Sequence, residues 1–363
     1  MKPVTDNTQL SRFVLKGFKS IAECDLELGS LNILIGANGA GKSNFVEFFK
    51  LMQQLVESHL QLYVSRQGGP DALLYFGRKK TEQLEVHLYF GDKSYSCTLE
   101  PTQDNRMVFT NEGFVNIKTG AQTFVGGHFE SLAAVNNETS LVFSCVPAMS
   151  QWRVFHFHDT SHSALIKQRN AIQDNIYLRP DARNLAAFLY ILKQTHPAHY
   201  QKIVQTIRLT APFFGDFFLR PQPDNPDMIE LEWLEKGEDV PFKAHQLSDG
   251  TLRFACLATA LLQPEEKQPA TILFDEPELG LHPYAITLLA SMLKSVSIKK
   301  QVIVSTQSVE LISEFDPEDL VVVDRKDRAS VFTRLESEKW QAWLQEYSLG
   351  ELWTKNLFGG RPA

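Results

Sequence analysis

The spacing of apolar residues predicts a strand followed by a helix near the start of the chain. Residues 31–35 form an apolar run typical of a buried strand, and residues 44–55 place phenylalanine and methionine side chains at helical spacing. Residues 13–15 and 24–28 are expected to form two short strands that lead into this unit. The first long helix is therefore expected to follow a buried strand directly, with a glycine-rich turn between them.

The residues after this helix alternate between apolar and polar positions, which predicts a meander of antiparallel strands. The segments concerned are residues 83–90, 94–99 and 107–115. A loop is expected at residues 66–70, before the meander, and another strand at residues 152–158.

Helical spacing returns in the middle of the chain. Helices are predicted at residues 184–194 and 198–209, and Pro212 is expected to stop the second one. Strand character follows at residues 228–234 and 241–245.

The last third of the chain alternates between strands and helices. The expected elements are a helix from Thr251, a strand at 270–274, a helix at 284–296, a strand at 301–305, a short helix at 309–315 and a strand at 320–324. Such alternation implies right-handed crossovers and a parallel sheet. A final helix is expected to dock one apolar face, formed by Trp340, Trp343, Leu344 and Tyr347.

The turn between the first buried strand and the first helix reads Gly-x-x-x-x-Gly-Lys-Ser, the form of a phosphate-binding loop. Its glycines let backbone N–H groups point inward, and the helix N-terminus adds a partial positive charge. Lys42 is expected to reach the β- and γ-phosphates of ATP, and Ser43 to bind Mg²⁺. A glycine-rich turn without a ligand is the alternative, which both flanking elements disfavour. The predicted nucleotide-binding residues are Asn38, Gly39, Ala40, Gly41, Lys42, Ser43 and Asn44.

Two carboxylates at the tip of a later apolar strand give a second signal. Asp275 and Glu276 follow residues 270–274, and α/β sheets hold ligands at the carboxyl ends of their strands. Asp275 is expected in the Mg²⁺ shell, and Glu276 is placed to polarise an attacking water as general base. The alternative is that both acids only keep the surface soluble.

A third segment, Leu-Ser-Asp-Gly, comes immediately before a predicted helix. Ser248 and the backbone amides near Gly250 offer an anion site at the helix N-terminus. Taken alone, this pattern is no more than a helix cap.

Composition and charge are those of an ordinary globular protein. The 363 residues are 43% hydrophobic and 22% charged, and the net charge of −7 gives no general attraction to nucleic acid. The four cysteines show no paired spacing and are expected to be reduced core thiols of a cytoplasmic protein. No apolar run is long enough to span a bilayer, so no membrane association is expected.

Two other groups of side chains are open to a functional or a structural interpretation. The histidines at positions 156, 158 and 162, with Asp159, allow a metal site, although packing or surface roles are the simpler explanation. The basic clusters are Arg78, Lys79 and Lys80, and Arg325, Lys326 and Arg328. Solvated faces explain these clusters more simply than DNA contact.

Together, these motifs resemble those of the ABC-class ATPases of the SMC and RecF type. The phosphate loop, the Leu-Ser-Asp-Gly signature, the Asp-Glu-Pro-Glu strand end and a Ser-Thr-Gln-Ser strand end follow one another in this order. More narrowly, the chain is similar to the stand-alone, AAA-named, RecF-like predicted ATPases that lack coiled coils. Residues 177–185, 275–283 and 347–353 mark this subfamily without explaining a function.

The resemblance implies further roles. It implies that Ser248 and Gly250 touch the γ-phosphate held by a second subunit, and that residues 278–283 form a dimer-crossing loop. It assigns Gln307 to the catalytic switch position, where most relatives have histidine, and glutamine cannot titrate near neutrality. The glutamine that contacts Mg²⁺ from the lid is not evident. Gln67 is a candidate, with a solvated loop residue as the alternative.

The sequence therefore predicts an α/β fold: an ABC-type P-loop ATPase head with a mixed core sheet, an antiparallel meander and an inserted helical lid. The expected division is residues 1–119, 120–245 and 246–363. Only residues 325–363 follow the last predicted core strand, too few for the nuclease domain that OLD-type relatives carry, so no nuclease activity is expected of this chain.

The expected function is Mg²⁺-dependent ATP hydrolysis, coupled to a homodimer that sandwiches ATP. It is expected to serve DNA maintenance, repair or mobile-element defence, with a partner protein and with DNA as a possible ligand. A slow ATP sensor that scaffolds an effector is the main alternative. A transporter ATPase is a third interpretation, disfavoured because no coupling glutamine is evident.

Overall fold

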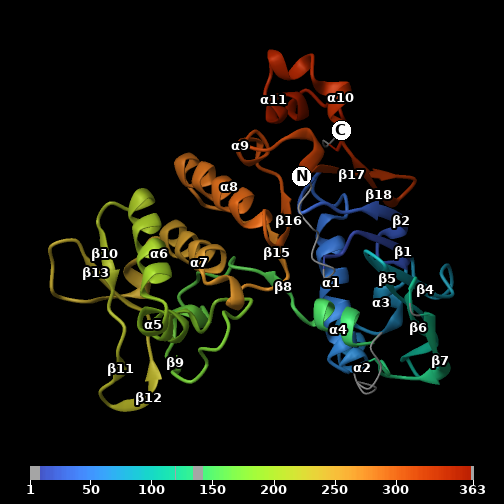
Figure 1. The fold of residues 1–363 in the computed structure, drawn as a ribbon, viewed down its shortest axis with the longest axis horizontal. Coiled ribbons are helices and arrows are strands. Elements are labelled where there is room, and N and C mark those ends of the chain that lie inside the picture. Colours follow the sequence, from blue (N-terminus) through green and yellow to red (C-terminus); the bar gives the residue numbers. More distant parts are fainter. Residues whose placement is uncertain (1–8, 119, 134–141, 361–363) are drawn as a thin grey trace. The chain divides into compact units, whose positions relative to one another are not determined.

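The computed structural model describes residues 9–118, 120–133 and 142–360, which pack into two compact units (Figure 1). The first unit lies within residues 1–154, 270–273 and 299–363, and the second comprises residues 155–269 and 274–298.

The units divide the chain differently from the predicted boundaries after residues 119 and 245. Residues 120–154 belong to the first unit because strand β7 (Gly120–His128) pairs with β6 (Met107–Asn116) of the meander. Helix α7 (Asp249–Leu262) belongs to the second unit, where it packs against α6 (Pro197–Thr210).

The first unit contains two six-stranded sheets. One has the order β2-β1-β4-β5-β6-β7, and all of its pairings are antiparallel, which confirms the predicted meander. Its remaining strands are β1 (Arg12–Phe18), β2 (Ile21–Glu27), β4 (Leu84–Phe90) and β5 (Lys93–Pro101). Alternate residues of β4 are buried, as expected of a strand with one face against a core.

The second sheet has the order β18-β17-β3-β16-β15-β8. Its strands are β3 (Leu31–Ile35), β8 (Trp152–Phe155), β15 (Thr271–Asp275), β16 (Gln301–Thr306), β17 (Leu320–Lys326) and β18 (Ala329–Arg334). Strand β3 pairs in parallel with both β16 and β17, whereas β17 and β18 are antiparallel. All five residues of β3 are buried, as expected of a central parallel strand. The sheet is therefore mixed, as predicted.

Helix α1 (Lys42–Val56) fixes the core of the first unit. The Phe45 ring meets Phe13 of β1 edge-on with centroids 5.2 Å apart, and Phe49 packs against Trp152 of β8 at 4.9 Å. These aromatic side chains bury large apolar areas, which anchors the helix that begins at the phosphate loop.

The other helices of the first unit are short. They are α2 (Leu60–Gln67), α3 (Pro70–Leu73), α4 (Val142–Ser150), α9 (Val309–Ile312), α10 (Ser337–Trp340) and α11 (Leu349–Thr354). The loop predicted at residues 66–70 is wrong in extent, because α2 continues to Gln67 and α3 starts at Pro70. Two glycines with positive φ at 68 and 69 allow the sharp turn between these helices.

The final helix predicted around residues 340–347 is also wrong. Helix α10 ends at Trp340, and a separate 3₁₀ turn covers Trp343–Gln345. Trp340 packs edge-on against Phe358, and Lys355 lies 3.6 Å from the ring centroid of Tyr347. These aromatic side chains pack against residues further along the chain, so they do not share one helix face.

The second unit combines helices α5 (Leu185–Thr195), α6, α7 and α8 (Pro283–Ser297) with two small antiparallel sheets. One sheet consists of β10 (Phe214–Phe217), β13 (Glu232–Glu235) and β14 (Phe242–Lys243). The other consists of β11 (Pro221–Gln222), β12 (Asn225–Ile229) and β9 (Asn170–Ala171). The single strand predicted at residues 228–234 is therefore two strands in different sheets.

The subfamily segment at residues 177–185 is organised by one buried side chain. Asn184 accepts a hydrogen bond from the backbone N–H of Arg179 at 2.9 Å and donates to the carbonyl oxygens of Asp174 and Tyr177, both at 2.8 Å. Since Asn184 is fully buried, these bonds satisfy its amide and fix the turn before α5. This segment therefore has a structural role.

Candidate functional site

The phosphate loop connects β3 to α1 in the first unit. Gly39 and Gly41 have φ of 78° and 121°, a left-handed region that favours glycine. Lys42 is buried, and its Nζ donates to the carbonyl oxygens of Gly36 at 2.6 Å and Ala37 at 3.1 Å. The ammonium group therefore lies within the turn, where the oxygens of a phosphate are comparable partners.

Side chains from three other segments hold this loop in place. Ser330 of β18 donates to the carbonyl oxygen of Ala40 at 2.6 Å, and its hydroxyl lies 2.7 Å from the hydroxyl of Ser20. Asn44 donates to Ser20 at 2.6 Å. A methyl group at Gly41 would overlap the Ser330 hydroxyl, so this glycine is required by packing as well as by its backbone conformation. The loop is therefore preorganised.

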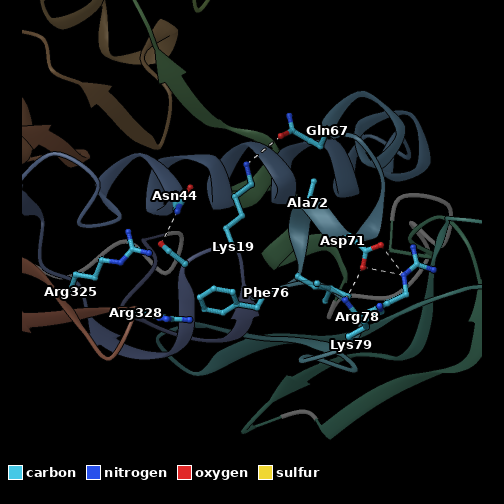
Figure 2. Close-up of a pocket in the computed structure, with 13 residues that line it drawn as sticks. Lys19, Asn44, Gln67, Asp71, Ala72, Phe76, Arg78, Lys79, Arg325 and Arg328 are labelled. Atoms are coloured by element: carbon cyan, nitrogen blue, oxygen red, sulfur yellow. Dashed lines mark hydrogen bonds and ion pairs between the residues drawn. The ribbon is translucent and has the colours of Figure 1, made fainter.

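A cavity of about 820 Å³ lies beside the first turn of α1 (Figure 2). Asn44 lines it next to Ser20 and Lys19, and the ring of Phe76 faces it from the turn after α3. Phe76 is 54% exposed and has a positive φ of 56°. An open aromatic face next to a phosphate loop is an arrangement that suits a nucleotide base.

The lining of this cavity is strongly basic. The cationic residues are Lys19, Arg78, Lys79, Arg325 and Arg328, and Asp71 is the acidic one. Arg78 donates a hydrogen bond to the carboxylate of Asp71 at 3.1 Å. Arg325 donates to the carbonyl oxygen of Gly39 in the phosphate loop at 3.3 Å. Burial lowers the pKa of Lys19, although the nearby Glu47 carboxylate opposes this effect. The sequence showed the four lining residues Arg78, Lys79, Arg325 and Arg328 only as parts of short basic clusters, and it singled out neither Lys19 nor Phe76.

Gln67 also lines this cavity, at the end of α2 rather than on a loop. Its side-chain oxygen accepts a hydrogen bond from Lys19 Nζ at 3.2 Å (Figure 2). The structure thus places Gln67 in the lining of the basic cavity of the first unit.

The carboxylates lie in the second unit, where Asp275 is the last residue of β15 and Glu276 follows it. Asp275 Oδ1 is buried, and no described residue donates a hydrogen bond to it. A buried carboxylate oxygen without a protein donor suits a hard divalent cation, which takes oxygen ligands. The donor set therefore fits Mg²⁺. Glu276 follows with a positive φ of 46°, so the backbone turns sharply there.

Arg253 and His158 connect the neighbouring segments of the second unit. His158 Nε2 lies 2.7 Å from the backbone carbonyl oxygen of Asp275, which requires that nitrogen to carry the proton. Arg253 of α7 donates to the carbonyl oxygens of His158 and Leu279, both at 2.9 Å. The strand predicted at residues 152–158 ends at Phe155, so both histidines of this stretch lie outside it.

The histidine metal site has no support within the described residues, where no group of three or more His, Cys, Asp or Glu side chains is arranged around a common point. The rings of His156 and His158 lie 4.2 Å apart, but His162 stacks near His245 with centroids 5.8 Å apart. The four cysteines are free and buried, and burial raises the pKa of Cys24 to about 12. Burial also raises the pKa of Cys97 and Cys256, so these three thiols stay protonated at neutral pH.

The signature residues begin α7 in the second unit. Ser248 is the N-cap, and its Oγ accepts a hydrogen bond from the backbone N–H of Thr251 at 3.2 Å. A methyl group at Gly250 would lie 2.6 Å from the carbonyl oxygen of Gly280. Gly250 therefore allows α7 to pack closely against the loop that follows the carboxylates, a requirement the sequence did not reveal.

Gln307 lies in the first unit, directly after β16. The next residue, Ser308, caps α9 by accepting from the N–H of Leu311 at 3.1 Å, and its own N–H donates to Thr306 at 3.0 Å. The first unit thus contains the phosphate loop and Gln307, and the second contains Ser248, Asp275 and Glu276.

Comparison with solved structures identifies the fold. The chain resembles an Smc head bound to the C-winged helix domain of ScpA, with a TM-score of 0.60 and 17% identity, over 91% of this chain and 99% of that one. For an Smc head from Pyrococcus furiosus with an extended coiled coil, bound to the C-terminal domain of ScpA, the TM-score is 0.56 and the identity 17%, with 93% and 98% covered. For an Smc head from Pyrococcus yayanosii the values are 0.53 and 12%, with 93% and 99% covered.

These likenesses show that the chain has the fold of an Smc head domain, as the sequence predicted. No curated protein matches the chain in sequence. Within the described residues, no helix is both long enough and apolar enough to cross a membrane. A family model described as "AAA domain, putative AbiEii toxin, Type IV TA system" matches residues 126–313, more than half of the chain. The chain therefore belongs to this family of AAA domains.

Proposed function

We propose that this protein binds ATP on the phosphate loop of its first unit and hydrolyses it with Mg²⁺. The observation that carries the proposal is the preorganised loop, in which two glycines have left-handed φ and the buried ammonium group of Lys42 lies inside the turn. Direct binding of ATP, measured by calorimetry on the wild-type protein, tests it.

The Mg²⁺ ion would be held by Ser43 and Asp275, as the buried unpaired oxygen of Asp275 suggests. When bound, it would neutralise developing charge on the phosphates. Glu276 would accept the proton of the attacking water, and Gln307 would orient that water and the γ-phosphate by hydrogen bonds.

The nucleotide base would occupy the basic cavity, next to Phe76. Replacing the ring by a methyl group removes the stacking surface, so Phe76→Ala is expected to raise the Kd for ATP about tenfold. Fluorescence titration with a labelled ATP analogue measures this change. Leu62→Ala is the matched control, because Leu62 is also exposed in the first unit but does not line the cavity. If Phe76→Ala and Leu62→Ala bind ATP with equal affinity, the nucleotide base does not stack on Phe76.

The switch position gives a test of the hydrolysis step. Gln307→Ala removes both hydrogen-bonding groups and is expected to lower kcat about a hundredfold while the Kd for ATP changes little. Gln307→His should remain active, because the resemblance gives histidine this role in relatives. A phosphate-release assay, paired with calorimetry, separates the two parameters. A folded His variant that binds ATP without turnover would contradict the role assigned to Gln307.

We further propose that two copies engage through ATP, with Ser248 of each copy meeting the γ-phosphate on the other. Ser248 supports this role because it presents a hydroxyl and helix N-terminal amides to solvent. A protein partner is also proposed, since two of the similar Smc heads were solved with ScpA.

The proposed biological role is DNA maintenance, repair or defence against mobile elements. The family description, which names a type IV toxin–antitoxin system, supports the defence role. The alternative is a slow ATP sensor that scaffolds an effector. Turnover measured with and without DNA separates them: DNA-stimulated hydrolysis supports the first role, and slow turnover that ignores DNA supports the second.

A further inference from the structure

Residues 347–360, named here the closing segment, contact two parts of the proposed nucleotide site at once. The segment contains α11 and the turn that follows it, and it belongs to the first unit. Its sequence marks the subfamily, yet none of its residues takes part in the chemistry proposed above. Its packing indicates a different role.

The first contact is with α9, the short helix that starts two residues after Gln307. A methyl group at Gly350 would overlap the Ser313 hydroxyl and the backbone carbonyl oxygen of Val309, and it would lie 2.8 Å from Val309 Cγ1. Ser313 donates to the carbonyl oxygen of Val309 at 2.8 Å and lies 3.4 Å from the Ser348 hydroxyl. At Gly350, α11 therefore packs directly against the backbone and side chain of Val309 and against the Ser313 hydroxyl, with no room for a further methyl group.

Burial and capping keep α11 in this position. Leu349 and Leu352 are 2% and 0% exposed. Ser348 and Glu351 form a capping box: the N–H of Ser348 donates to the Glu351 carboxylate at 2.8 Å, and the N–H of Glu351 donates to Ser348 Oγ at 3.3 Å. A capped and buried helix resists displacement, so it can fix the position of the helix it touches.

The second contact is with the phosphate loop. A methyl group at Gly360 would lie 2.9 Å from Val322 Cγ1, 3.4 Å from the carbonyl oxygen of Val323 and 3.5 Å from the Cα of Gly36. Gly36 is the first residue of the loop, and a methyl group there would overlap the same Val323 oxygen. The middle of β17 thus lies between the start of the phosphate loop and the turn at Gly360.

We infer that the closing segment is a positioning element, which keeps the switch residue Gln307 and the phosphate loop in fixed positions relative to each other. It acts through α9 at one contact and through Gly36 at the other. This inference rests on the proposed function, because it concerns the same nucleotide site. Small displacements of positioned groups reduce catalysis strongly, so changes in this segment should affect activity from outside the site.

The two contacts predict two different kinetic effects. Gly350→Ala disturbs the contact with α9 directly, and Leu352→Ala removes a fully buried side chain that anchors α11 itself. Both variants are expected to lower kcat about tenfold or more while the Kd for ATP stays within about twofold. Gly360→Ala disturbs the contact with Gly36 and is expected to raise the Kd about tenfold, with a smaller effect on kcat. A segment that only stabilises the fold would produce neither pattern.

Matched controls separate positioning from stability. Leu99→Ala truncates an equally buried leucine in the meander of the first unit, so it should lower the melting temperature as Leu352→Ala does but leave kcat unchanged. Gly127→Ala places a methyl group at another glycine with positive φ, where no atom lies within 4 Å, and it should leave the Kd unchanged.

Calorimetry and a phosphate-release assay on the full chain, below the melting temperature of every variant, give both parameters. If the wild-type protein binds and hydrolyses ATP but Leu352→Ala has the same kcat as Leu99→Ala, the inference is wrong and the proposed function stands. If the wild-type protein binds no ATP, the proposed function itself fails. The inference also predicts that the α9 contact affects kcat and the Gly36 contact affects the Kd. If all closing-segment variants lose kcat and ATP affinity to the same extent, this assignment of separate effects is wrong.

Discussion

Lys42→Ala is expected to abolish measurable ATP binding. The Nζ of this residue lies 2.6 Å from the Gly36 carbonyl oxygen inside the loop, and the side chain is only 4% exposed. Its charge therefore acts on a bound phosphate with little screening by water. Removing one partner of a buried, hydrogen-bonded charge pair costs about 2–5 kcal/mol, which corresponds to a loss of affinity between about 30-fold and several thousand-fold.

Calorimetry measures the affinity, and thermal melting provides an independent readout. A ligand at 100 times its Kd stabilises the native state by about 2.7 kcal/mol, so saturating ATP should raise the melting temperature of the wild-type protein. This shift should vanish in Lys42→Ala. Lys50→Ala is the matched control, since Lys50 lies on the same helix but pairs with Glu47 at the surface. Wild-type ATP affinity in Lys42→Ala would show that the loop is not the phosphate site.

The second large effect concerns Glu276. Glu276→Gln keeps the shape of the side chain but removes the base that accepts a proton from water, so kcat should fall by about 10²–10⁴-fold while ATP still binds. Because the γ-phosphate then persists, the proposed ATP-bound dimer should accumulate. Light scattering on Glu276→Gln with and without ATP and Mg²⁺ measures this directly.

A second substitution tests the shared site. Ser248→Arg places bulk and charge at the exposed N-terminus of α7, so it should leave a monomer that still binds nucleotide. In the proposed dimer, each ATP site combines Lys42 of one copy with Ser248 of the other. A mixture of the Lys42→Ala and Ser248→Arg variants should therefore restore at most one intact site per heterodimer. If the Glu276→Gln protein stays monomeric under saturating ATP and Mg²⁺, the proposed mechanism, in which two copies share each ATP, is wrong. A dimer that forms equally without ATP would show that ATP does not assemble it.

Local sequence patterns predicted much of the fold correctly. The apolar run before the phosphate loop is β3, and the helical spacing after it is α1, because the buried face of each element repeats with its own period. The antiparallel meander was predicted for the same reason. These elements are long and strongly patterned, so neighbouring residues carry enough information to define them.

Prediction failed where partners come from distant parts of the chain. Trp340 and Tyr347 show helical spacing, but they pack against Phe358 and Lys355, so no single helix forms there. Residues 228–234 look like one strand, yet β12 pairs with β9 and β11, whereas β13 pairs with β10 and β14. Local spacing cannot distinguish one strand from two that join different sheets.

The chemistry of the proposed nucleotide site was predicted from the sequence alone. The phosphate loop, the paired carboxylates and the signature are short contiguous motifs whose function depends on adjacent backbone groups. The tertiary structure decided which distant side chains surround them. It brought Ser20 and Ser330 to the loop, placed Phe76 beside a basic cavity, and packed Gly350 and Gly360 against α9 and Gly36. Contacts between residues hundreds of positions apart depend on how the strands order within the sheets, and no local pattern records that order.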